Sequence, residues 1–183
     1  MLLEAHNLEK GYGIQKLFSI DKLEIGENDR IGLVGANGCG KSTLLKILSG
    51  QTEADAGTIK ASCSIAYITQ EQETEGDTSA YLLSRMNLKD SACKSGGEKT
   101  RLAIAAAFSR ETKLLFADEP TTNLDVKGIE TLEKMLKGFK GAFVLVSHDR
   151  YLLDQVCDTI WEIGDEELRV FPGNFTAWFE QKN

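Results

Sequence analysis

The sequence lacks any apolar run close to the roughly 20 residues that a membrane-spanning helix requires. Its start, MLLEAHNLEK, contains acidic and amide side chains and differs from a secretory signal, which has basic residues followed by a long apolar stretch. We therefore expect a cytoplasmic protein without stable membrane insertion. Cysteines are also few: the four are scattered and form no C-x-x-C pair, which favours reduced thiols over disulfides or zinc ligands.

Positive charge is scarce in this chain. The 21 lysines and arginines are outnumbered by 28 aspartates and glutamates, which gives a formal net charge of -7. This balance excludes a surface that binds nucleic acid through overall charge alone, although a net count does not register a local basic patch. Internal repeats and low-complexity tracts are absent as well. With 183 residues, 42% of them hydrophobic, the chain has the length and composition of one compact domain.

Short β-rich runs alternate with amphipathic helical patterns along the chain. The runs IGLV, LLFA and FVLV are apolar throughout, which is typical of parallel strands covered on both faces. The runs KLFSIDKLEI and EELRVFPG alternate more and predict antiparallel edges. The pattern predicts an α/β fold, with a mostly parallel central sheet flanked by helices and an antiparallel β edge. We expect strands at 16–25, 30–35, 58–61, 64–69, 113–118, 142–147, 158–163 and 166–173, and helices at 41–50, 98–110, 129–139 and 149–157.

The strongest local pattern is GANGCGKST, which fits the phosphate-binding loop G-x-x-x-x-G-K-[ST] between a predicted strand and a predicted helix. Its glycines allow backbone N–H groups to point at β- and γ-phosphates, beside the positive end of the helix. Lys41 would add charge for these phosphates, and the Ser42 hydroxyl would bind Mg²⁺. A chance glycine-rich turn is the alternative, which the flanking strand and helix disfavour. The candidate nucleotide-binding residues here are Gly35, Asn37, Gly38, Cys39, Gly40, Lys41, Ser42 and Thr43.

Two acids, Asp118 and Glu119, end the buried run KLLFADEP. Ligands bind at the carboxyl ends of strands in open α/β sheets. Asp118 would therefore hold Mg²⁺ through a water molecule, and Glu119 would act as general base on the attacking water. A strand that runs into a solvated acidic turn is the alternative. The phosphate-binding loop in the same chain favours the catalytic interpretation.

Four segments, GANGCGKST, SGGEKTR, LLFADEPTTNLD and VLVSHD, occur in this order, and with them the chain resembles the ATP-binding-cassette (ABC) ATPases over nearly its whole length. The resemblance implies Mg²⁺-dependent hydrolysis of ATP. It implies that Tyr12 stacks on adenine and that Gln70 senses Mg²⁺ and the γ-phosphate. His148 would contact the γ-phosphate and orient Glu119, and Asp125 would lie at the seam of a cassette dimer. Taken alone, Tyr12 could be an ordinary surface aromatic and His148 a structural histidine.

The segment SGGEKTR begins a predicted helix, with Ser95 suited to the N-cap and Glu98 to the first turn. Such a helix end binds anions. In ABC ATPases this signature completes the ATP site of a second cassette that packs head to tail with the first. The resemblance implies that the second cassette belongs to the same full-length chain or, for residues 1–183 alone, to a second copy in a homodimer. The residues that would contact the partner's ATP are Ser95, Gly96, Gly97 and Glu98. Lys94 departs from the leucine that usually precedes Ser-Gly-Gly, and a helix that is merely well capped predicts no such dimer.

Residues 70–95 are short compared with the helical subdomain that docks transporter cassettes onto their membrane partner. At about 1.5 Å of rise per helical residue, the segment could form one short helix. We interpret residues 1–183 as a single ABC cassette whose helical subdomain, 70–95, is shortened. The length weakens, without excluding, the alternative of an ATP-binding subunit that energises a membrane ABC transporter. A nucleotide-dependent dimerisation module is a third possibility.

The tail, SHDRYLLDQVCDTIWEI followed by FPGNFTAWFEQK, is similar to the end of the first cassette in ABC-F proteins. These carry two cassettes on one soluble chain and act on ribosomes. The resemblance implies that residues 172–183 form a helix leading to an interdomain linker, and that the native chain continues past Asn183. It is greatest to the antibiotic-resistance branch, whose linker reaches the peptidyl-tRNA. The i, i+3, i+4 spacing of Phe175, Trp178 and Phe179 predicts that these aromatics pack on the sheet.

Overall fold

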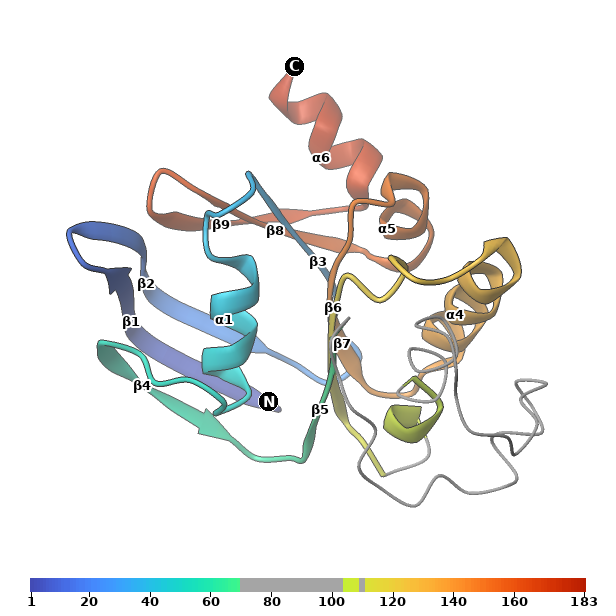
Figure 1. Ribbon diagram of the computed structural model, residues 1–183, viewed down its shortest axis with the longest axis horizontal. Helices are drawn as coiled ribbons and strands as arrows, with labels where there is room; N and C mark the ends of the chain where they lie inside the picture. Colours follow the sequence, from blue (N-terminus) through green and yellow to red (C-terminus); the bar gives the residue numbers. More distant parts are fainter. Residues whose placement is uncertain (70–103, 109–110) are drawn as a thin grey trace.

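The computed structural model describes residues 1–69, 104–108 and 111–183, and the strands in these ranges form two sheets (Figure 1). The larger sheet has the strand order β5-β6-β7-β3-β8-β9. Its strands pair in parallel except for β9, which is antiparallel to β8. This confirms the predicted mostly parallel sheet with an antiparallel edge. The strand bounds are β3 (Arg30–Gly35), β5 (Ile65–Thr69), β6 (Leu114–Asp118), β7 (Ala142–Val146), β8 (Thr159–Gly164) and β9 (Glu167–Pro172).

The smaller sheet is antiparallel, with the order β2-β1-β4. It consists of β1 (Leu3–Tyr12), β2 (Gln15–Ile25) and β4 (Ala56–Ala61). The sequence patterns did not predict β1. Alternation begins with the buried residues Leu3 and Ala5, but Asn7 adopts a φ of 51°. The pairing with β4 shifts at this point, so the next buried residue is Leu8 rather than Asn7. A period of two is the sequence signature of a half-buried strand, and this irregularity interrupts it.

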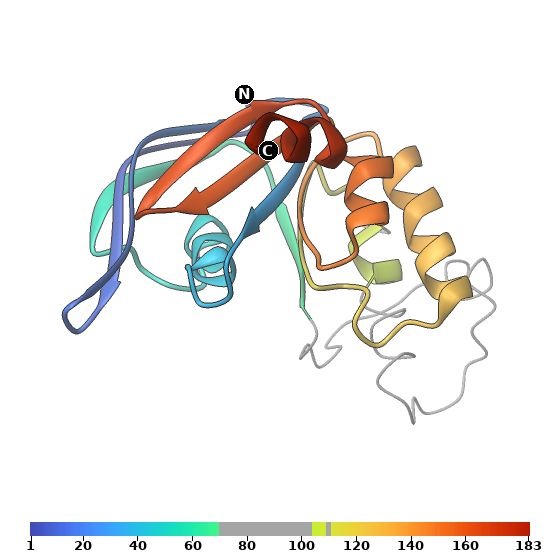
Figure 2. The ribbon, with the colours of Figure 1, turned by 90° about the horizontal axis from the view of Figure 1, so that it is seen from above.

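Helices cover both faces of the parallel sheet (Figure 2). The helix α1 lies on the face toward the smaller sheet, and α4 and α5 lie on the other. Residues 104–108 are helical as well. The remaining bounds are α1 (Lys41–Leu48), α4 (Val126–Gly138), α5 (Arg150–Val156) and α6 (Phe175–Lys182). In the described part of the chain, no helix combines the length and apolar character needed to cross a membrane.

The central strands contribute to two separate cores because neighbouring side chains point to opposite faces. Phe116 and Val144 join the core with α1 and the smaller sheet. Phe143 and Leu145 join the core beneath α4 and α5. Every residue of β6 and β7 is buried, which explains why these strands are apolar rather than alternating, except for Asp118 at the end of β6.

The helix α6 follows β9 and is capped by Asn174, whose side chain accepts a hydrogen bond from the backbone N–H of Ala177. Phe175 and Trp178 are partly buried against the core beneath α4 and α5. Phe179, by contrast, is 46% exposed, so the prediction that all three aromatics pack on the sheet was wrong for this residue. The short helix lies at the edge of the core and turns only part of its aromatic face inward, and Phe179 stacks on Phe175 instead.

Candidate active site

The loop between β3 and α1 contains glycines at positions where a side chain would clash or be strained. A side chain at Gly35 would place its Cβ 2.5 Å from the carbonyl oxygen of Ile163, so only glycine fits beside β8. Gly40, the N-cap of α1, has a φ of 103°, which also favours glycine. Because Gly40 has no side chain to cap the helix, the first N–H groups of α1 are available to a bound anion.

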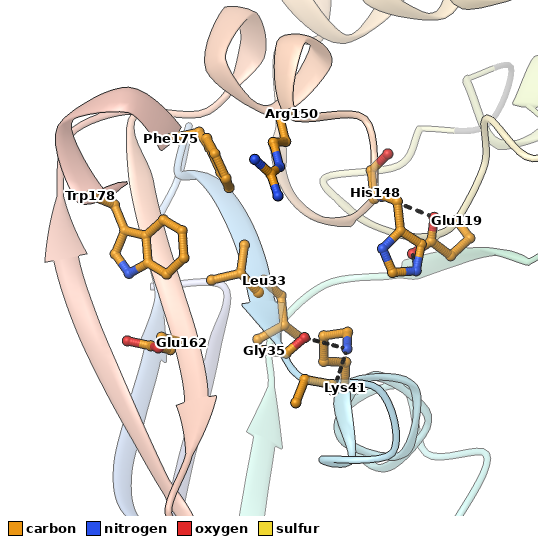
Figure 3. A pocket seen from close by; sticks show the side chains of 12 residues that line it. Leu33, Gly35, Lys41, Glu119, His148, Arg150, Glu162, Phe175 and Trp178 are labelled. Atoms are coloured by element: carbon orange, nitrogen blue, oxygen red, sulfur yellow. Dashed lines mark hydrogen bonds and ion pairs between the residues drawn. The ribbon is translucent and has the colours of Figure 1, made fainter. Parts of the chain in front are cut away.

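Lys41 extends back across this loop (Figure 3). Its Nζ donates hydrogen bonds to the carbonyl oxygens of Gly35 and Ala36, both at 2.9 Å. No carboxylate within the described ranges forms an ion pair with this ammonium group. A phosphate that entered the loop would therefore meet a positive charge already held in place by two neutral carbonyl groups.

Asp118 is the last residue of β6, and its side chain is buried at the carboxyl end of the sheet. The Tyr67 hydroxyl on β5 donates a hydrogen bond to Asp118 Oδ2 over 3.3 Å. Burial raises the pKa of Tyr67, and the neighbouring negative charge of Asp118 raises it further. The phenol is therefore a neutral donor to the carboxylate at neutral pH.

Glu119 follows β6 directly and adopts a φ of 51°, a left-handed conformation that is costly for a residue with a side chain. Its backbone N–H donates to the carbonyl of Val146 at the end of β7 over 2.8 Å, which holds the turn in place. The turn directs the Glu119 side chain to His148, which lies two residues after the end of β7. The imidazole Nε2 lies 3.3 Å from Oε1, and the His148 backbone N–H donates to Oε2 over 3.2 Å. The two predicted catalytic residues therefore contact each other (Figure 3).

These elements enclose a groove of about 420 Å³, which is within the usual range for a small-molecule site. The phosphate-binding loop lines it on one side and the ends of β6 and β7 on the other. Of the predicted site residues, Tyr12, Asn37, Gly38, Gly40, Lys41, Ser42, Thr43, Asp118, Glu119 and His148 line this groove. A second cavity of about 290 Å³ adjoins it and reaches α6 (Figure 3). The predicted site residue Gly35 lines this second cavity. The side chain of Cys39, the remaining predicted loop residue, is partly buried and packs against the core around α1.

The predicted Mg²⁺ ligands are Ser42, Gln70 and Asp118, of which Gln70 lies outside the described residues. Ser42 and Asp118 both line this groove from different elements, the start of α1 and the end of β6. Hydroxyl and carboxylate oxygens are the ligand types that Mg²⁺ prefers. Mg²⁺ usually takes only one or two such protein ligands and completes its shell with water and phosphate oxygens. The residues at this position therefore fit the ion.

Tyr12 ends β1 at the outer rim of the groove, and it is 59% exposed. The Lys10 ammonium group lies 5.3 Å from the centre of its ring. Asp55 fixes the position of this hairpin, because it accepts hydrogen bonds from the Gly11 backbone N–H at 2.8 Å and from Lys10 Nζ at 3.0 Å. These contacts lower the pKa of Asp55, the hydrogen bond from Gly11 contributing most, so the carboxylate is charged at neutral pH.

Several predicted site residues do not line the groove or lie outside the described residues. Asp125 is the N-cap of α4 and accepts a hydrogen bond from the Gly128 backbone N–H over 2.9 Å. A role at a dimer seam stays a prediction for this residue. Gln70, the signature residues Ser95, Gly96, Gly97 and Glu98, and the segment 70–95 lie outside the described residues.

Sequence patterns did not indicate four residues that the structure places in or beside the groove. Gln15 and Leu17 line it from β2, Tyr67 holds Asp118, and Asp55 holds the hairpin of Tyr12. None of them belongs to a sequence motif, and the position of each relative to the groove depends on how separate strands pair. The apolar strand 64–69 was recognised, but nothing local to it indicates that Tyr67 reaches an acid on another strand.

Comparison with known proteins gives one family match: the family described as ABC transporter matches residues 19–122, more than half of the chain. The solved structure described as "Structure of ATP binding subunit of ABC transporter" superimposes with a TM-score of 0.83. It covers 100% of this chain and 93% of that chain at 22% identity, which supports the shared fold alone.

Two curated relatives are more similar in sequence. The chain is 36% identical over 170 residues to the erythromycin resistance ATP-binding protein MsrA of Staphylococcus epidermidis, covering 89% of this chain and 35% of the relative. It is 33% identical over 174 residues to the ribosome protection protein VmlR of Bacillus subtilis (strain 168), covering 91% and 32%. The chain thus spans about a third of the length of these relatives.

Proposed function

The chain belongs to the ABC transporter family, and on that premise we propose that it is the ATP-hydrolysing cassette of an ABC-F protein that protects ribosomes from antibiotics. Nucleotide binding and ATP hydrolysis follow from the family itself. The observation that carries the catalytic part is the contact between Glu119 and His148 opposite the phosphate-binding loop. The ribosomal part is supported by the names of the resistance and ribosome protection relatives.

Hydrolysis requires a held phosphate chain and an activated water. The loop N–H groups and Lys41 bind the β- and γ-phosphates at the start of α1. Glu119 takes the proton of the attacking water as general base, which typically contributes about 100-fold or more to a rate. His148 holds both carboxylate oxygens of Glu119, one through its imidazole and one through its backbone N–H. Ser42, Gln70 and Asp118 would hold Mg²⁺, which would neutralise charge on the phosphate oxygens.

The site is complete only when a second cassette contributes its signature. On this proposal Ser95 and Glu98, with the two glycines between them, contact the ATP of a partner cassette in the same full-length protein, and Asp125 lies at the seam. A ligand shifts a conformational equilibrium only by the difference in its affinity for the two states. ATP that bridges both cassettes therefore favours the closed pair, and its hydrolysis favours opening.

Action on the ribosome in the cytoplasm is supported by the relative named a ribosome protection protein, and the length of the relatives is compatible with it. They are about three times as long as this chain, which leaves room for a second cassette and a linker that contacts the ribosome and tRNA. The helix α6 would lead toward that linker. The competing function is an ATP-binding subunit of a membrane transporter, which the likeness in fold to such a subunit keeps open.

The two functions are separated by co-sedimentation of the full-length protein with ribosomes. The Glu119→Gln variant is used because we expect it to bind ATP and to hydrolyse it slowly. A Glu119→Gln variant that also carries Lys41→Ala is the matched control, in which we expect ATP binding to be weakened. We expect the single variant to pellet with ribosomes only when ATP is present, and the double variant to remain in the supernatant. A single variant that binds ATP but never pellets, and is recovered with membranes, would support the transporter subunit instead.

A further inference from the structure

Tyr67 makes one polar contact that the catalytic scheme above does not use. It lies on β5, which pairs in parallel with β6 so that Thr69 is opposite Asp118 and Tyr67 is opposite Phe116. Residues two apart on a strand point to the same face. The Tyr67 side chain therefore leans along the sheet toward its carboxyl end, where its hydroxyl reaches Asp118 Oδ2 at 3.3 Å.

Burial makes this contact hard to replace. Tyr67 is 8% exposed and Asp118 is 9% exposed, and polar groups at such positions need a partner within the protein. In the described residues, Tyr67 is the partner of the Asp118 carboxylate, and Asp118 is the partner of the phenol. The hydrogen bond from Tyr67 uses Oδ2, and no side chain among the described residues donates a hydrogen bond to Oδ1, which leaves that oxygen to a ligand.

The Tyr67 ring is also part of a packed apolar core. Tyr67 belongs to the core that also contains Leu44 and Leu48 of α1, the helix whose first turn carries Ser42. The same helix contacts β6, the strand that ends in Asp118. The ring therefore belongs to the same apolar core as the helix that carries Ser42 and the strand that carries Asp118.

We propose that Tyr67 is a positioning residue for the Mg²⁺ of the nucleotide site. It does not bind the ion; it holds one oxygen of Asp118 so that the other is presented to the metal or to a metal-bound water. Hydrogen-bond partners of metal-binding side chains typically change metal affinity or activity by about 10- to 100-fold when they are removed. This inference rests on the ATPase part of the proposed function and is independent of the ribosomal part.

The test is Tyr67→Phe in the full-length protein, because this change removes the hydroxyl and keeps the ring in the core. Mn²⁺ serves as the probe, and its binding is followed by electron paramagnetic resonance with a non-hydrolysable ATP analogue present. We expect the half-saturating Mn²⁺ concentration to rise by about 10-fold. Affinity for the same analogue in EDTA should remain within about 2-fold of wild type, since the loop and Lys41 are untouched. The matched control is Tyr151→Phe, which removes the hydroxyl of a 65% exposed tyrosine on α5 and should leave both values unchanged.

Asp118→Asn provides the baseline, because it reports Mn²⁺ bound anywhere else in the full-length protein. If Tyr67 acts through Asp118, adding Tyr67→Phe to Asp118→Asn should have no further effect. Unchanged Mn²⁺ affinity in Tyr67→Phe would overturn the proposal, and so would an equal loss of analogue binding in EDTA, which indicates a general structural role. If the analogue does not strengthen Mn²⁺ binding even in the wild type, the ATPase function itself fails together with this inference.

Discussion

The two sheets meet at the nucleotide groove but differ in how much of each strand is covered. Every residue of β6 and β7 in the parallel sheet is buried. In the smaller sheet, β1 and β2 contain buried, partly buried and exposed positions, and β4 is exposed at all but one residue. The parallel sheet presents Asp118, Glu119 and His148 from the ends of its strands, whereas the antiparallel sheet presents Tyr12 at an exposed hairpin.

This difference suggests that the parallel sheet positions the catalytic groups and that the smaller sheet contributes to binding of the base. Catalysis needs atoms held within a fraction of an ångström, and the buried strands can support the costly backbone conformation of Glu119. Recognition of a flat base needs mainly an accessible ring, which an exposed hairpin provides. Substitutions in the parallel sheet should therefore change stability and chemistry, and those in the smaller sheet should change affinity.

The largest difference should appear in stability. Phe116 is fully buried at the centre of β6, and truncating such a residue costs about 3–5 kcal/mol. Ile59 is the one partly covered residue of β4, and Ile59→Ala should cost about 1–2 kcal/mol because solvent already reaches it. Urea unfolding of Phe116→Ala and Ile59→Ala measures both costs. Equal losses would show that the two sheets are equally tightly packed.

The next largest effect concerns chemistry at the end of β6. Glu119→Gln keeps the shape of the side chain and removes the general base, so hydrolysis should fall by at least about 100-fold. ATP affinity should remain close to wild type, because the phosphate-binding loop is unaltered. Single-turnover hydrolysis and equilibrium nucleotide binding are the two measurements. Near-normal turnover would refute the assignment of Glu119 as the base.

Lys41→Ala should act on binding rather than on the chemical step. A hydrogen bond to a charged group is worth about 1.5–3 kcal/mol, which corresponds to an affinity about 10- to 100-fold weaker. The loss should be the same for ATP and for inorganic tripolyphosphate, which has no base, because Lys41 meets only phosphates. Isothermal titration with both ligands checks this, and Lys46→Ala on the same helix is the matched control. A loss confined to ATP would place Lys41 away from the phosphates.

The sequence predicts those parts of the fold and site that depend on neighbouring residues. The strand 30–35 and the helix that starts at Lys41 agree with β3 and α1, because glycine spacing and apolar periodicity act over a few residues. The strand β1 was not predicted, because the irregularity at Asn7 interrupts the alternation of its residues. The exposure of Phe179 was not predicted either, because helical spacing indicates which residues share a face but not how much of that face the core covers.

Contacts between distant strands could not be predicted in the same way. Tyr67 and Asp118 are 51 residues apart, and their contact depends on the register between β5 and β6. The link from Asp55 to Gly11 similarly depends on how the turn before β4 lies against β1. No period within either segment encodes such a register, so one sequence read alone identifies Asp118 but not the residue that orients it.

The smallest effect should come from the antiparallel sheet, at Tyr12. Stacking on a base is worth about 1–3 kcal/mol when the aromatic ring is removed, and the exposure of Tyr12 places the loss near the lower end, about 10-fold in ATP affinity. Tyr12→Phe should bind ATP like wild type because it keeps the ring. Tyr12→Ala should bind tripolyphosphate normally, which is the opposite of the pattern expected for Lys41→Ala. If Tyr12→Ala weakened the binding of ATP and of tripolyphosphate equally, its hairpin would be supporting the phosphate-binding loop rather than contacting the base. The proposed difference in role between the two sheets would then be wrong for Tyr12.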